Sequence, residues 1–147
     1  MTDVDDRVRL AILERLAETG EGPTAAEIAT ALGEDERGVA EAYSRLAEDH
    51  VLVLRPGTEE IWMAHPFSAV PTGFRVETAR GSSYANCVWD ALGIPAMLGT
   101  DARIETACAD CGEPLELHVR GGDLEPVDWV AHFAVPAARW WDDIGHT

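Results

Sequence analysis

The sequence predicts an α+β protein with an N-terminal winged helix-turn-helix-like region. A small mixed α/β core of antiparallel strands and one short helix follows it. Residues 1–64 show three helical patterns and then a strand hairpin, whereas residues 65–147 alternate apolar and polar residues between turns rich in Gly and Pro. The chain of 147 residues is long enough for a small domain joined to a second module. We therefore place a domain boundary between residues 64 and 65.

Three helices and a hairpin are predicted in the N-terminal region. Apolar residues recur at every fourth position of residues 4–19, which indicates an amphipathic helix that ends at Gly20. Thr24 with Glu27 forms a capping-box pattern and begins a second helix that ends before Gly33. The remaining predicted elements are a helix over 35–49, a strand over 51–54, a turn at 55–57 and a strand over 61–63.

The elements of residues 65–147 are shorter. Gly81, Ser82 and Ser83 are expected to form a loop before a short helix, which Gly93 and Pro95 limit. The other predicted elements are a connection over 65–71, an extended segment over 72–76, strands over 102–108, 115–119 and 129–135, and the start of a helix over 137–143.

The charge argues against nucleic acid and anionic lipid as partners. The chain has 11 basic residues, all of them Arg, against 27 acidic residues, which gives a net charge of −16. Residues 1–60 hold six Arg and fifteen Asp or Glu, and the helix over 35–49 begins with three acidic residues in the four positions 34–37. Contact with phosphates requires the opposite sign. A helical region that packs on the second half or forms a dimer surface is the expected alternative.

A cytoplasmic protein without a membrane partner is expected. The N-terminus lacks the basic and apolar regions of a signal peptide, and no apolar run approaches the roughly 20 residues that span a bilayer. The three cysteines are an odd number without secretory context, so reduced thiols are the expectation.

Cys87 and Asp90 are the candidate catalytic residues. Residues three apart share one face of a helix, so a soft nucleophilic sulfur and a proton-carrying carboxyl group would face the same space. Cys87 would lie near a helix N-terminus, where the helix dipole lowers a thiol pKa. Trp89 and Tyr84 could shield such a site from water. The alternative is a buried cysteine that serves as a small apolar residue.

Cys108 and Cys111 form a Cys-x-x-Cys motif with three possible roles. They could be structural turn residues, ligands for mercury or another metal, or a redox pair. His118 and His132 could complete a Cys₂His₂ set, although their spacing matches no zinc-finger pattern.

The fourteen residues from Asn86 to Gly99, NCVWDALGIPAMLG, resemble the active-site helix of the organomercurial (alkylmercury) lyase family. The order of elements also agrees, and the resemblance is specific over residues 74–120. It implies an enzyme in which Cys87 attacks the mercury of a small organomercurial compound and Asp90 delivers a proton to the carbon. The implied products are a hydrocarbon and Hg(II), which passes to cellular thiols or a mercuric reductase. No cofactor is implied.

This sequence departs from the family pattern in its cysteines. The resemblance implies a second catalytic cysteine downstream, but no cysteine follows Cys111, and the sequence ends about where that residue should come. Three explanations stay open: the sequence is a shortened member, Cys108 or Cys111 supplies the second sulfur, or cleavage of the carbon–mercury bond has been lost. The missing segment would leave sheet edges uncovered, which a homodimer could cover.

Two further functions remain open from the sequence alone. One is a winged-helix metal-responsive regulator, or a mercury-binding protein without lyase activity. The other is an enzyme that uses Cys87 as nucleophile toward a different small electrophile.

Overall fold

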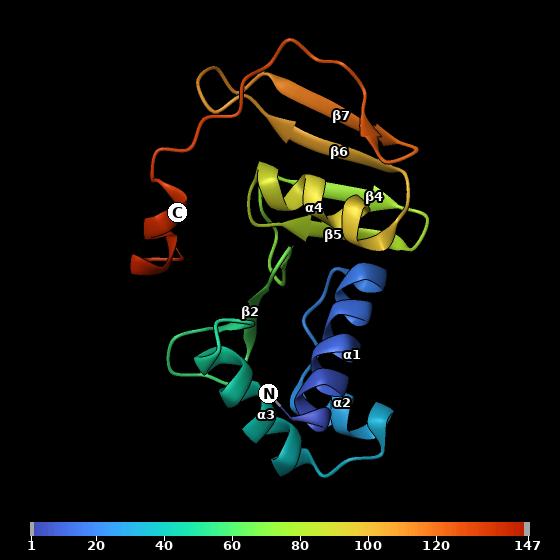
Figure 1. Cartoon of the computed structure of the whole chain (residues 1–147), viewed down its shortest axis with the longest axis vertical. Coiled ribbons are helices and arrows are strands. Elements are labelled where there is room, and N and C mark those ends of the chain that lie inside the picture. The colour runs from blue at the N-terminus through green and yellow to red at the C-terminus, as the bar shows by residue number, and fades with distance from the viewer. Residues whose placement is uncertain (1, 146–147) are drawn as a thin grey trace.

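The computed structural model describes residues 2–145 and has a mixed α/β architecture built on one antiparallel sheet (Figure 1). Eight strands lie in the order β1-β2-β3-β5-β4-β6-β7-β8. The predicted combination of helices with antiparallel strands is therefore confirmed. The strands are β1 Val53–Leu54, β2 Ile61–Ala64, β3 Phe67–Ser68, β4 Arg75–Thr78, β5 Gly81–Ala85, β6 Ala102–Ala107, β7 Pro114–Arg120 and β8 Asp123–Leu124.

The first three helices are α1 Asp3–Thr19, α2 Ala25–Leu32 and α3 Glu36–Glu48. Capping boxes begin α1 at Thr2 and α2 at Thr24, because each threonine side chain accepts a backbone N–H that the helix leaves unpaired. The apolar faces of these helices meet in a common core. Its fully buried members in α1 and α3 are Val8, Ile12, Leu16, Val39, Ala42, Tyr43 and Leu46.

The sheet continues across the expected boundary at residue 65. Strand β3 begins directly after the cis peptide bond between His65 and Pro66. It pairs with β2 on one side and with β5 on the other. One hydrophobic core cluster includes residues of the N-terminal helices and of the strands.

Residues 81–85 form strand β5, so the prediction of a loop at 81–83 is wrong. β5 pairs with β4 through four residue pairs. Gly81 allows α1 to approach the start of this strand, because a Cβ atom there would collide with the carbonyl oxygen of Glu18. Gly81 also has a φ of 156°, which favours glycine. Close packing of a helix against the strand is a long-range contact that local turn propensity does not reveal.

Helix α4, Val88–Leu98, lies over β4 and β5 and carries Asp90 in its first turn (Figure 1). The prediction that Gly93 and Pro95 limit this helix is wrong, since it continues to the left-handed Gly99. Pro95 removes one backbone donor, but the proline ring is buried beside Ile94 in the core. Burial of this apolar face outweighs the local preference of proline.

The predicted strand over 129–135 is also wrong. β8 pairs with the outer edge of β7, and residues 125–135 then run past the sheet without regular structure, with Val130 91% exposed (Figure 1). A 3-10 helix, η1 Ala137–Asp142, follows near the predicted helix over 137–143. The alternation of apolar residues in this segment is therefore not accompanied by pairing with a strand of the sheet.

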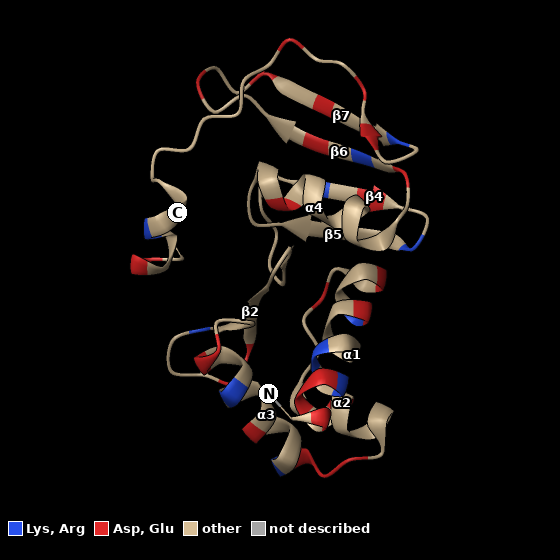
Figure 2. Ribbon diagram, in the orientation of Figure 1, with Lys and Arg blue, Asp and Glu red and all other residues tan. Residues whose placement is uncertain are grey.

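Acidic residues occur on both the helical part and the strand part of the chain (Figure 2). Within residues 2–145, no helix combines the length and apolar character needed to cross a membrane.

Candidate active site

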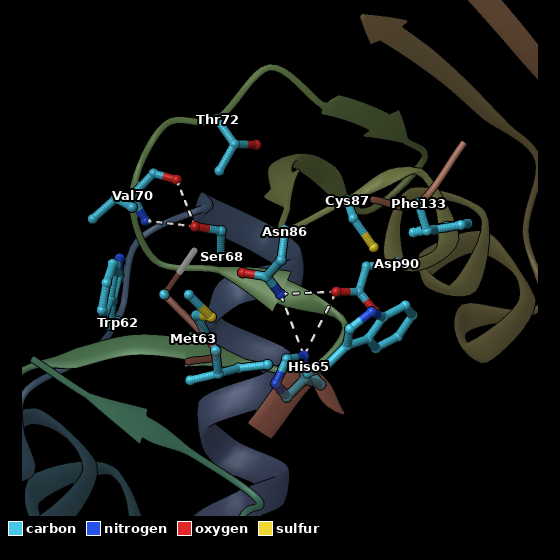
Figure 3. A pocket seen from close by; sticks show the side chains of 13 residues that line it. Trp62, Met63, His65, Ser68, Val70, Thr72, Asn86, Cys87, Asp90 and Phe133 are labelled. Carbon is cyan, nitrogen blue, oxygen red and sulfur yellow. Dashed lines mark hydrogen bonds and ion pairs between the residues drawn. The ribbon is translucent and has the colours of Figure 1, made fainter. Parts of the chain in front are cut away.

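A cavity of about 340 Å³ lies where the first strands, the start of α4 and the C-terminal segment meet (Figure 3). Both Cys87 and Asp90 line it. The structure thus brings together the two residues that the sequence analysis paired. The other lining residues are Trp62, Met63, His65, Ser68, Val70, Thr72, Asn86, Phe133, Trp140, Ile144 and Gly145.

Cys87 is the N-cap residue of α4 and is half-buried. Burial raises the pKa of the Cys87 thiol, and the nearby carboxylate and side-chain hydrogen bond of Asp90 raise it further. Backbone N–H groups of Asp90 and Trp89 oppose this rise, but they do not cancel it. The expectation of a thiol pKa lowered by the helix N-terminus is therefore wrong, because desolvation outweighs the helix contribution. Burial therefore favours the protonated form of the Cys87 thiol, which lies beside the Asp90 carboxyl group.

The carboxyl group of Asp90 is held from two sides. Asn86 donates from Nδ2 to Asp90 Oδ2 at 3.0 Å, and His65 Nδ1 lies 3.6 Å from the same oxygen. The Asn86 amide also donates to the carbonyl oxygen of Phe67 at 3.3 Å, which ties it to strand β3. These contacts fix the direction of the Asp90 carboxyl group toward the cavity (Figure 3).

His65 and Asn86 each keep one buried polar atom, His65 Nε2 and Asn86 Oδ1, that has no hydrogen-bond partner within residues 2–145. Buried polar atoms are nearly always paired in folded proteins. Both atoms belong to side chains that line the cavity and contact Asp90.

The sequence analysis did not identify either residue. Asn86 lies four residues before Asp90, and this helical spacing could have indicated it. His65 reaches the site only through the pairing of β3 with β5, where Phe67 lies opposite Ala85. No local sequence pattern predicts the register between β3 and β5.

Aromatic side chains from distant parts of the chain form the walls. Trp62 comes from β2, and Phe133 and Trp140 come from the C-terminal segment, where their rings lie 5.5 Å apart. Trp89 and Tyr84, which the sequence analysis suggested for this role, do not line the cavity, and Trp89 is 69% exposed. The side chain of residue 89 points away because it lies on the outer face of α4.

Cys108 and Cys111 do not line the cavity that holds Cys87. They lie in the turn between β6 and β7, with Cys108 half-buried and Cys111 exposed. Within the part of the chain that the structure describes, no group of three or more His, Cys, Asp or Glu side chains is arranged to hold a metal ion. His118 instead pairs with Glu116 at 2.7 Å, and His132 is exposed.

Comparison with known proteins places the same region in a family. A family model described as alkylmercury lyase matches residues 67–147, more than half of the chain, and this range includes Cys87 and Asp90. The chain belongs to the alkylmercury lyase family. No curated protein sequence matches it.

The fold agrees with solved structures, ten chains of which match. One is the crystal structure of the mercury-bound form of MerB2, with a TM-score of 0.68 and 23% sequence identity. The match covers 86% of this chain and 60% of that chain, so this alkylmercury lyase family member spans less than two thirds of the solved protein.

Proposed function

We propose that this protein is an organomercurial lyase that cleaves the carbon–mercury bond of small organomercurial compounds. The observation that carries the proposal is the shared cavity of Cys87 and Asp90 within the region that matches the alkylmercury lyase family. A thiol and a carboxyl group in hydrogen-bond contact can bind a soft metal and move a proton at the same place.

The proposed reaction uses the thiol proton of Cys87. The Cys87 sulfur bonds to the mercury of R–Hg–X while its proton passes to the Asp90 carboxylate. Asp90 then donates this proton to the carbon, the electron pair of the Hg–C bond becomes the new C–H bond, and R–H leaves. Cys87–SH and R–Hg–X thus become Cys87–S–Hg–X and R–H, without a change of oxidation state in the protein.

The contacts around Asp90 fit this role. A carboxyl group that alternately gains and loses a proton needs a fixed position beside the reacting carbon. Asn86 supplies it through the 3.0 Å hydrogen bond to Asp90 Oδ2, and His65 Nδ1 lies 3.6 Å from the same oxygen. We propose both as positioning residues for Asp90. The aromatic walls and the volume of about 340 Å³ suit a small organic group such as phenyl.

Several finer features belong to the same proposal. Helices α1–α3 with the β1–β2 hairpin form the winged-helix-like region, and residues 65–147 form the catalytic region. Cellular thiols or a mercuric reductase accept Hg(II), which requires a reducing compartment such as the cytoplasm. A homodimer that covers the β8 edge is testable by size-exclusion chromatography. Cys108 and Cys111 lie outside this cavity.

The test is release of benzene from phenylmercury in excess thiol. The wild-type chain is expected to release benzene, and Cys87→Ala is expected to lose this activity while its circular dichroism spectrum stays unchanged. Trp89→Ala is the matched control, since this exposed side chain lies on the same helix outside the cavity. Equal benzene release by Cys87→Ala and the wild type would end the proposal. Mercury binding by the wild type without benzene release would favour a binding protein instead.

A further inference from the structure

The Cys108–Cys111 turn lies at the same end of the sheet as Cys87. Arg75 of β4 lies opposite Tyr84 of β5 on one side and Glu105 of β6 on the other. Cys87 follows Tyr84 by three residues, and Cys108 follows Glu105 by three residues. The two segments therefore leave the sheet at one end, separated by two strand spacings or roughly 10 Å. The turn after β6 and the start of α4 lie on the same side in Figure 1.

Backbone hydrogen bonds hold the turn that carries Cys108 and Cys111 in a tight loop. The Cys108 N–H donates to the Glu113 carbonyl oxygen at 2.9 Å, and the Gly112 N–H donates back to the Cys108 carbonyl oxygen at 2.9 Å. Gly112 has a φ of 72°, a conformation that allows the chain to fold back into β7. The tight loop keeps residues 108 and 111 adjacent.

Direct contacts surround the Cys108 sulfur. Backbone N–H groups of Cys111 and Asp110 and the thiol of Cys111 donate hydrogen bonds to it, and these bonds lower the pKa of the Cys108 thiol. Cys111 is exposed, so the pair is open to solvent. Burial instead raises the pKa of Cys87, so the two thiol sites differ in their readiness to form thiolate.

We propose that Cys108 and Cys111 form a second, solvent-facing dithiol site that binds Hg(II). Two thiolates suffice for a soft ion that favours sulfur, so the lack of a third ligand in the described residues does not exclude it. Two Hg–S bonds form and the two thiol protons go to solvent, with no oxidation or reduction.

The dithiol site also has a role in the proposed lyase reaction, and this role rests on the proposed function. The site is the first acceptor of the Hg(II) that the reaction leaves on Cys87. The Cys108 thiolate bonds to the mercury of Cys87–S–Hg–X, and X⁻ leaves. Cys111 then adds the second Hg–S bond, the Cys87 sulfur leaves the metal, and the Cys111 thiol proton passes to it. The pocket is then free for the next substrate. External thiols remove the ion from the exposed turn.

The test uses inorganic Hg(II) and full-length chains that carry Cys87→Ala, so no carbon–mercury cleavage is needed. Reduced protein is mixed with one equivalent of Hg(II) and an excess of monothiol, passed through a desalting column, and its mercury content is measured. The Cys87→Ala chain is expected to retain about one ion. Adding Cys111→Ser should lower retention by about tenfold or more, because the second sulfur acts at high effective concentration. Adding Glu113→Gln, which leaves both sulfurs, should retain the ion.

Equal retention with and without Cys111→Ser would overturn the dithiol site. The dithiol site would also be overturned if Cys108 and Cys111 form a disulfide under the assay conditions and the chain binds no mercury. Benzene release is measured separately on chains that keep Cys87. Loss of retention at the turn with intact benzene release overturns the dithiol site alone. Absence of benzene release with intact retention overturns the proposed lyase alone.

Discussion

The helical part of the molecule and the cavity treat buried polar groups in opposite ways. Asp5 of α1 is 1% exposed, accepts from Arg45 at 2.7 and 3.1 Å, and completes the capping box with Thr2. In the cavity, His65 and Asn86 keep buried atoms without partners within residues 2–145. A buried polar group whose hydrogen bonds are all made stabilises a fold. A buried polar group without a partner destabilises the fold unless a ligand supplies the missing hydrogen bond. The helical part thus favours stability, whereas the cavity keeps a stability cost that we propose serves substrate binding.

The largest effect that can test this contrast is expected at Asp90. Asp90→Asn keeps the size of the side chain but removes the proton carrier. Benzene release should fall by about 100-fold or more, the range that general acid catalysis contributes. The melting temperature should stay close to that of the wild type, since the group faces a cavity. A large loss of stability with little loss of rate would reverse the assignment of roles.

Asp5→Asn should show the opposite pattern. The Arg45 guanidinium, which donates hydrogen bonds to Asp5, holds the carboxyl pKa at about 2 despite burial. The substitution removes charge-assisted bonds and should lower the free energy of unfolding by roughly 2 kcal/mol. The specific rate of the folded protein should not change. Urea unfolding and the benzene assay, run on the same samples, measure the two quantities.

The same residue makes a prediction for acid conditions. Its folded-state pKa lies below the unfolded value near 3.8, so the stabilisation is complete above that pH and is lost as the pH falls toward 2. The stability difference between the wild type and Asp5→Asn should therefore shrink over this window. A constant difference would show that packing, not charge, explains the substitution.

A smaller effect is expected at Asn86. Asn86→Leu keeps a similar volume but removes the donor to Asp90, so the carboxyl group loses its fixed direction. The rate of benzene release should fall by about tenfold, in line with one lost hydrogen bond to a charged group. The pH–rate profile should shift as well, which a purely structural change would not produce. An unchanged profile at unchanged rate would remove Asn86 from the site.

Local patterns in the sequence were sufficient for the first three helices and for the cysteine–carboxylate pair, but not for the end of α4, which continues past Gly93 and Pro95 to Gly99. Capping residues, the four-residue apolar repeat and the Cys87–Asp90 spacing all act within one or two helical turns, where neighbours in sequence are neighbours in space. The strand prediction failed at 129–135, where alternation persists without a partner strand. It also missed β5, whose pairing depends on α1 and β4.

The sequence by itself determined the helical region, the paired sulfur and carboxyl group of α4, and the resemblance to alkylmercury lyases that the family match bears out. Only the tertiary structure decided that His65 and Asn86 hold Asp90, that burial raises the pKa of the Cys87 thiol, and that the cysteine turn after β6 lies at the same end of the sheet. The physical reason is the sequence separation over which each interaction acts. Helical spacing acts over a few residues, whereas desolvation and strand register depend on segments that meet only after the chain has folded.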